Sequence, residues 1–134
     1  MKSREGYVSN SSSSSFLISY DKNVFGDLGA FFSSFNEDDR TETHLGDLGS
    51  EVKRWLNPNL YDTKKEKIAA RKIPSRIRKA QDEGRDVIAL WIDYNSAEMI
   101  SLLKSLDRQK SGKFEIIASC EPFETILPDY HDTI

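Results

Sequence analysis

Val87-Ile-Ala-Leu-Trp-Ile92 is a nearly continuous apolar run in a chain of 134 residues. Such a run is typical of a strand that is buried on both faces of a sheet. A helical pattern follows it, in which apolar side chains recur at Met99, Leu102, Leu103 and Leu106. After a turn at residues 111–113, a second strand is expected at residues 114–119. Because strand, helix and strand follow one another within about 33 residues, their order predicts a right-handed parallel crossover.

A third strand is expected at residues 16–20, which read Phe-Leu-Ile-Ser-Tyr. The sequence therefore predicts an α/β fold: a small sheet of three or more strands, at least partly parallel, with helices packed against it. One domain is expected at this length, with a serine-rich N-terminal arm over residues 1–15 and a single α/β domain over residues 16–134. Residues 36–43 are expected to form a solvated acidic loop, and residues 122–134 are expected to pack as irregular structure.

The tetrapeptide Gly-Asp-Leu-Gly occurs twice, at residues 26–29 and 46–49, and each copy precedes a helical apolar pattern. Aspartate can accept hydrogen bonds from the backbone N–H groups at the start of a helix, so the repeat predicts two capped helices. A phosphate-binding glycine loop is the alternative, but an aspartate at its centre would repel phosphate. Two more helices are expected: one runs from residue 62 or 63 to about 72, and the other resumes after an interruption at Pro74 and continues to residue 83.

The charge of the chain is distributed unevenly. Its formal net charge is −3, yet residues 53–79 hold ten basic and two acidic residues, a net charge of +8. The other residues hold nine basic and twenty acidic ones, a net charge of −11. This basic block, residues 53–79, should attract anionic partners to one region of the protein and repel them elsewhere.

The basic block is the stronger of two candidate sites. A solvated helical face is the ordinary interpretation of a charge run, but the uncompensated positive charge here exceeds what solubility requires. The block could bind an acidic protein surface, or it could bind nucleic-acid phosphates with an aromatic residue stacked on a base. No helix-turn-helix, RNA-recognition or zinc-finger pattern accompanies it. The candidate binding residues are Lys64, Lys65, Arg71, Lys72, Arg76, Arg78, Lys79 and Trp55.

Carboxylates at the ends of the expected strands form the weaker candidate site. Ligands of open parallel sheets bind beyond the carboxyl ends of the strands, where Asp21, Asp93 and Glu121 lie in this sequence. If the strands run parallel, these groups converge, and paired carboxylates could act as acid and base or bind a metal. Aspartate is also common at strand ends for backbone reasons alone. Cys120 is expected to be a buried inert thiol, because no motif links a histidine to it.

The N-terminus contains the stretch Arg4-Glu-Gly-Tyr-Val-Ser-Asn-Ser-Ser-Ser-Ser-Ser-Phe16, with five consecutive serines between apolar residues. Serine runs favour turns and linkers, because their hydroxyls compete for backbone hydrogen bonds. A free linker would not carry Tyr7, Val8 and Phe16, so these residues are expected to dock an ordered arm. The stretch resembles an N-terminal signature, R-x-G-[YF]-V-S-N-S-S-S-S-S-F, shared by many otherwise unrelated small proteins of tailed bacteriophages. The resemblance covers 13 residues and implies a phage origin rather than an activity.

Composition argues against several classes of protein. No run approaches the ~18 apolar residues that a membrane helix requires. A single cysteine cannot form an intramolecular disulfide, and the two histidines lack the spacing of zinc ligands. These features predict a soluble protein of a reducing compartment, the cytoplasm of an infected bacterial host, with no cofactor, no metal and no membrane association.

The leading hypothesis is a phage accessory protein that binds a host or phage macromolecule and inhibits or redirects a host system. A protein is the expected partner and a nucleic acid is the alternative. Other hypotheses are a nucleic-acid-binding protein that uses residues 53–79, a small metal- or phosphate-dependent enzyme that uses the strand-end carboxylates, and a virion component. The sequence leaves the identity of the partner and the oligomeric state open.

Overall fold

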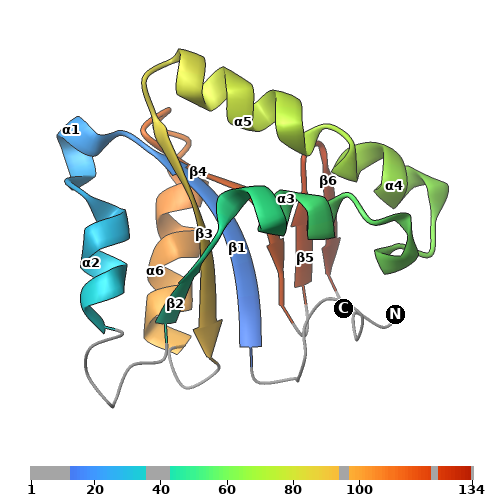
Figure 1. The fold of residues 1–134 in the computed structure, drawn as a ribbon, viewed down its shortest axis with the longest axis horizontal. Coiled ribbons are helices and arrows are strands. Elements are labelled where there is room, and N and C mark those ends of the chain that lie inside the picture. The colour runs from blue at the N-terminus through green and yellow to red at the C-terminus, as the bar shows by residue number, and fades with distance from the viewer. Residues whose placement is uncertain (1–12, 36–42, 94–96, 122–123, 134) are drawn as a thin grey trace.

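The computed structural model describes residues 13–35, 43–93, 97–121 and 124–133, and Figure 1 shows how their helices and strands are arranged. The strands in this part of the chain are β1 (Ser13–Tyr20), β2 (Thr43–Gly46), β3 (Asp86–Asp93), β4 (Phe114–Cys120), β5 (Glu124–Leu127) and β6 (Tyr130–Thr133). The helices are α1 (Lys22–Phe25), α2 (Leu28–Phe35), α3 (Leu48–Trp55), the 3-10 helix η1 (Pro58–Leu60), α4 (Lys64–Ala70), α5 (Ile73–Asp82) and α6 (Ala97–Arg108).

The strands form one sheet in the order β2-β3-β1-β4-β5-β6, and all five neighbouring pairs are antiparallel. The prediction of a partly parallel sheet is therefore wrong. The reason is the position of β1. Strands β3 and β4 do run in the same direction and are separated in sequence by α6, but β1 lies between them and pairs antiparallel with both. Helix α6 thus connects two strands that run in the same direction but are not neighbours in the sheet, because β1 is inserted between them.

Helices cover both faces of the sheet, so the core has two halves. One half lies between the sheet and helices α3, α4 and α5 (Figure 1). It includes Leu17 from β1 and Trp55 from α3. The other half lies against α2 and α6, and it includes Phe16 and Ile18 from β1. Strand β1 contributes to both halves because successive side chains of a strand point to opposite faces. The protein is therefore a three-layer sandwich with its sheet in the middle.

Strand β1 begins inside the serine run. Ser14 and Ser15 are buried, in a strand that pairs with β3 on one edge and with β4 on the other. The last three residues of the predicted arm therefore belong to a central strand. Of the apolar arm residues, Phe16 is buried in the core, whereas Tyr7 and Val8 lie outside the described residues.

Both copies of Gly-Asp-Leu-Gly cap helices, which confirms the prediction made from the repeat. Asp27 accepts a hydrogen bond from the backbone N–H of Ala30 at 2.9 Å, in the first turn of α2. Asp47 accepts one from the N–H of Ser50, also at 2.9 Å, in the first turn of α3. Such N–H groups have no partner within the helix itself. The aspartates thus occupy the donors that a phosphate would need.

Short strands are the elements that the sequence predictions miss. The expectation of irregular structure beyond residue 122 is wrong, because β5 and β6 form an antiparallel hairpin with Pro128 and Asp129 at its turn. Strand β2 pairs with β3 and begins at Thr43, the last residue of the expected acidic loop. Strands β2 and β5 contain only four residues each. That length is too short for alternation of apolar and polar side chains to identify a strand.

Candidate functional site

The structure separates the strand-end carboxylates. Asp21 follows β1, which runs opposite to β3 and β4, so Asp21 lies at the other end of the sheet from Asp93 and Glu121. Its carboxylate accepts a hydrogen bond from the N–H of Asn23 at 2.8 Å and lies 3.4 Å from Nζ of Lys113. Asp21 therefore caps α1, and it does not join the other two carboxylates in one site. The side chain of Asp93 lies outside the described residues.

Glu121 belongs to a largely buried ionic cluster with Lys104 and Glu124. Nζ of Lys104 lies 3.1 Å from a carboxylate oxygen of Glu121 and also contacts the carboxylate of Glu124. Burial raises the pKa of Glu121, because desolvation of its carboxylate outweighs the attraction of Lys104. For Lys104, desolvation acts to lower the pKa, but the two glutamates outweigh it and the pKa is raised. Stability of the fold should therefore depend on the ionisation of Glu121.

We expect Glu121→Gln to flatten the dependence of stability on pH. The folded protein holds the proton of Glu121 more tightly than the unfolded chain does. This group therefore stabilises the fold below its ordinary pKa of 4.5 and loses that contribution as pH rises through its raised value. The amide of glutamine does not ionise, so the variant does not lose this stability as the pH rises. The check is the melting temperature followed from mildly acidic to neutral pH, with Glu98→Gln on the exposed surface of α6 as the control. A wild-type profile in Glu121→Gln would contradict the expectation.

Neither cysteine chemistry nor metal binding gains support from the structure. Cys120 is buried in β4 at 1% exposure, which agrees with the prediction of a buried thiol. His44 is exposed on β2, and the side chain of His131 lies outside the described residues. Within the described ranges, no three His, Cys, Asp or Glu residues are grouped so that they could hold a metal ion.

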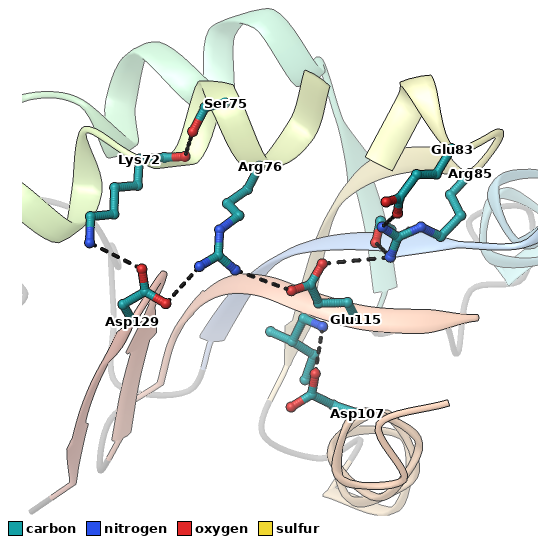
Figure 2. Close-up of polar contacts among 10 residues, drawn as sticks. Lys72, Ser75, Arg76, Glu83, Arg85, Asp107, Glu115 and Asp129 are labelled. Atoms are coloured by element: carbon teal, nitrogen blue, oxygen red, sulfur yellow. Dashed lines mark hydrogen bonds and ion pairs between the residues drawn. The ribbon is translucent and has the colours of Figure 1, made fainter. Parts of the chain in front are cut away.

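The basic block contains residues that hold the fold together. Lys72 and Arg76 of the α4–α5 region both bind Asp129, in the turn between β5 and β6, at 3.0 Å and 2.6 Å (Figure 2). Arg76 also lies 3.6 Å from Glu115 on β4. Hydrogen bonds from Lys72 and Arg76 hold the pKa of Asp129 below its ordinary value. Substitution of either cation would therefore loosen the β5–β6 hairpin as well as remove a surface charge.

The aromatic residues near the basic block also serve the fold. Trp55 is 2% exposed and lies in the core, so its ring is not placed to stack on a nucleic-acid base. The guanidinium of Arg54 lies over the ring of Trp91, 4.9 Å from its centroid. Nζ of Lys65 lies 5.3 Å from the ring centroid of Tyr130. Cation–π contacts of this kind restrain both cations at the surface.

A second group of cations faces solvent on α4. Lys64, Lys67 and Arg71 have the spacing i, i+3 and i+7, which places them on one flank of the helix. Lys64 and Arg71 are exposed and Lys67 is half-buried. None of the three forms an ion pair with another residue that the structure describes. We name these three residues the α4 face. The predicted binding residues omit Lys67, although its spacing from Lys64 was a usable signal.

An apolar cleft of about 150 Å³ borders the α4 face. Lys67 and Arg71 form part of its lining, and the other lining residues are Leu56, Pro58, Tyr61 and Ala70. Two large apolar side chains of this region are exposed, Leu56 to 37% and Ile68 to 44%. Protein interfaces commonly have an apolar centre and a polar rim. The α4 face and its cleft have this arrangement.

Comparisons with known proteins add no family to this description. No family model, no curated protein and no solved structure matches the chain. Among the helices that the structure describes, none is long and apolar enough to cross a membrane. The assignment of a function therefore rests on the geometry and charge of the surface.

Proposed function

We propose that the protein binds an acidic surface of another protein through the α4 face, as an accessory protein that inhibits or redirects a host system. One observation carries this proposal. Three cations lie on one flank of α4 beside an apolar cleft, and none of them has an ion-pair partner in the described part of the chain. Such cations steer an acidic partner toward the surface, and the cleft can receive an apolar side chain from it.

An acidic protein fits this surface better than a nucleic acid does. Because Trp55 is buried, its ring is not available to a base. Outside residues 53–79 the chain carries a net charge of −11, which repels a long polyanion beyond the immediate contact. The cleft beside Leu56 suits an apolar side chain, and phosphate groups would gain nothing from it.

The N-terminal resemblance to proteins of tailed bacteriophages supports the cytoplasm of an infected bacterium as the place of action. A small protein with a charged face and an apolar cleft needs no catalytic site to act there. Occupation of a functional surface on a host protein is sufficient to block that protein or to redirect it.

The triple variant Lys64→Glu, Lys67→Glu, Arg71→Glu should lose the partner. The fold should survive, since none of these side chains forms an ion pair with a described residue. Glutamate near the end of α4 costs at most about 1 kcal/mol per site through the helix dipole. Immobilised wild type and variant are exposed to lysate of the bacterial host, with and without nuclease. The protein that the wild type captures should bind the variant at least about tenfold more weakly, or about 1.4 kcal/mol.

The matched control reverses three exposed cations on other elements that form no ion pair with a described residue: Lys22→Glu, Lys53→Glu and Arg78→Glu. It changes the net charge equally and should retain the partner. Loss of the partner on nuclease treatment would assign the surface to nucleic acid instead. In that case the logarithm of the association constant for duplex DNA should fall linearly with the logarithm of the salt concentration, with a slope of about −0.9 for each phosphate neutralised. A folded α4-face variant that binds the captured protein as tightly as the wild type would contradict the proposal.

A further inference from the structure

Five of the seven residues of β4 lack a neighbouring strand on one edge. Strand β1 pairs along the whole length of β4, whereas β5 pairs only with Ser119 and Cys120. The ladder with β1 skips Ile117, which forms a β-bulge. Bulges bend a strand and often mark the point where its pairing ends, so β4 and β5 diverge here as a fork. Within the described residues, the stretch 114–118 has no strand partner on this edge.

A side chain occupies one hydrogen-bonding position on the free edge. The backbone N–H of Ile116 donates to Oδ1 of Asp107, from the last turn of α6, at 2.9 Å (Figure 2). The carboxylate oxygen stands where a carbonyl oxygen of an adjacent strand would lie. An unpaired strand edge is the template to which an extended peptide adds as a further strand.

Two adjoining clefts run along the free edge, with α5 on one side and α6 on the other. Their volumes are about 440 Å³ and about 290 Å³. Both clefts are lined by Arg76, Asp107, Lys110 and Glu115. The larger cleft is also lined by the apolar side chains of Ile116, Ile117 and Leu127. We name the two clefts together the β4 groove.

The acidic side chains of the β4 groove are engaged within the protein. Glu115 lies 3.6 Å from both Arg76 and Arg85, and Asp129 binds Arg76 at 2.6 Å (Figure 2). Asp107 accepts the backbone hydrogen bond described above. The remaining acidic lining residues also form ion pairs: Glu83 with Arg85, and Glu124 with Lys104.

Three cations of the β4 groove remain available. Lys79 comes from α5, Arg108 ends α6, and Lys110 follows two residues later; all three are exposed. No ion pair joins any of them to another described residue. Six cations and five carboxylates line the two clefts, so the net charge of the groove is +1. The three cations without an ion pair complement an anionic occupant.

The backbone of the β4 groove is strained at two places. Lys110 has a φ of 51° and Asp129 a φ of 60°, and the described part of the chain has no other non-glycine residue with positive φ. Both residues line the larger cleft. Glycine adopts this conformation without strain, so the turn itself does not explain a lysine at position 110. A residue whose backbone is strained and whose side chain lines a groove points to a function for that side chain.

We propose that the β4 groove binds an extended acidic segment of a protein partner, which pairs with the free edge of β4. Its carboxylates lie against Lys79, Arg108 and Lys110, and one of its carbonyl groups replaces the carboxylate of Asp107 on the N–H of Ile116. This surface is separate from the α4 face, so the inference stands whether or not the α4 face binds a partner.

The free edge favours a peptide over a nucleic acid. A peptide supplies backbone carbonyl and N–H groups at the spacing of a strand, and a nucleic acid has no such ladder. A peptide can place its carboxylates beside the three available cations, and it can place neutral residues at its other positions.

The test is a selection from a displayed library of random peptides, with the intact protein as the target. We expect peptides rich in Asp and Glu to be enriched. They should bind the triple variant Lys79→Glu, Arg108→Glu, Lys110→Glu at least about tenfold more weakly than the wild type. They should bind the α4-face variant as tightly as the wild type, which separates the two surfaces.

The variant Lys110→Gly distinguishes a binding role from a structural one. Glycine relieves the positive φ, so the melting temperature should rise, while affinity for the enriched peptides should fall. A lysine that served only the turn would not produce these opposite changes. The control Lys79→Ala, on α5, should lower the affinity without raising the melting temperature.

Amide hydrogen exchange locates the bound peptide. Enriched peptides should slow exchange within residues 114–117, because their backbone would join the ladder of β4. The proposal would be overturned by a selection that yields no acidic peptides, by undiminished binding to the groove variant, or by protection confined to other strands. Single-stranded DNA is added as a competitor. If it binds the wild type and displaces the peptides, and if it does not bind the groove variant, the groove would be assigned to nucleic acid instead.

Discussion

Leu90→Asp should leave no folded protein. Leu90 is 1% exposed, in the strand β3 that pairs with β2 on one edge and with β1 on the other. An unpaired carboxylate at this depth costs several kcal/mol, and the whole stability of a domain is only about 5–15 kcal/mol. We expect the variant to accumulate in the insoluble fraction on expression and to show no cooperative thermal transition after refolding.

The matched control is Ser101→Asp, which introduces the same side chain on the exposed surface of α6. It should melt cooperatively at close to the wild-type temperature, because exposed substitutions usually change stability by less than about 0.5 kcal/mol. A cooperative melt of Leu90→Asp at that same temperature would show that β3 does not lie between two layers of helices.

Trp55→Ala should destabilise the protein by about 3–5 kcal/mol. Trp55 is among the largest fully buried side chains of the described residues, and it lies in the core half formed with α4 and α5. Its truncation opens a cavity between α3 and the sheet. The hydroxyl of Tyr61 donates to the backbone oxygen of Trp55, which alanine retains, so the loss should come from the truncated ring. Urea denaturation followed by circular dichroism measures the change.

Asn59→Ala is the control for this experiment, because Asn59 is exposed in η1, four residues after the tryptophan. Its effect should stay within about 0.5 kcal/mol. If Trp55→Ala kept the wild-type stability but bound the partner more weakly, Trp55 would belong to the binding surface, as the sequence predicts.

Local features of the fold are predictable from the sequence, because the interactions that create them lie within one turn of a helix. Asp27 and Asp47 bond to N–H groups three residues away, so the Gly-Asp-Leu-Gly repeat was enough to locate two helix starts. The apolar periodicity of α3 and α6 and the apolar run of β3 depend on the same short range.

The order of the strands is not predictable in this way. Whether β1 lies beside β3 and β4 or at an edge depends on contacts between distant segments, and the local pattern of β1 is the same in either case. The expectation that Asp21 meets Asp93 and Glu121 fails for this reason. Strand β1 is inserted between β3 and β4 and runs antiparallel to both, so Asp21 lies at the opposite end of the sheet.

Contacts between distant segments also decide which cations of the basic block form ion pairs within the protein and which face solvent. Composition reveals the charge, but the residue that engages Lys72 and Arg76 is Asp129, 57 and 53 positions later in the chain. The cations Arg108 and Lys110 lie outside the block altogether and reach the β4 groove only because α6 ends beside β4. The sequence therefore indicates a basic surface, but it does not distinguish the cations that form ion pairs within the protein from those that are available to a partner.

The central position of β1 also affects how the chain folds during synthesis. Tyr20 pairs with Asp86, 66 residues later, and Ser15 pairs with Cys120, 105 residues later. A nascent chain therefore carries β1 with both edges unpaired until β3 has been synthesised, and with one edge unpaired until translation has passed β4. Non-local pairing of this kind slows folding, because the entropy of closing long loops is lost before the strand contacts form. The sheet should thus be completed only late in synthesis, and β1, one of its earliest segments to be synthesised, should be the most exposed to chaperones and to aggregation.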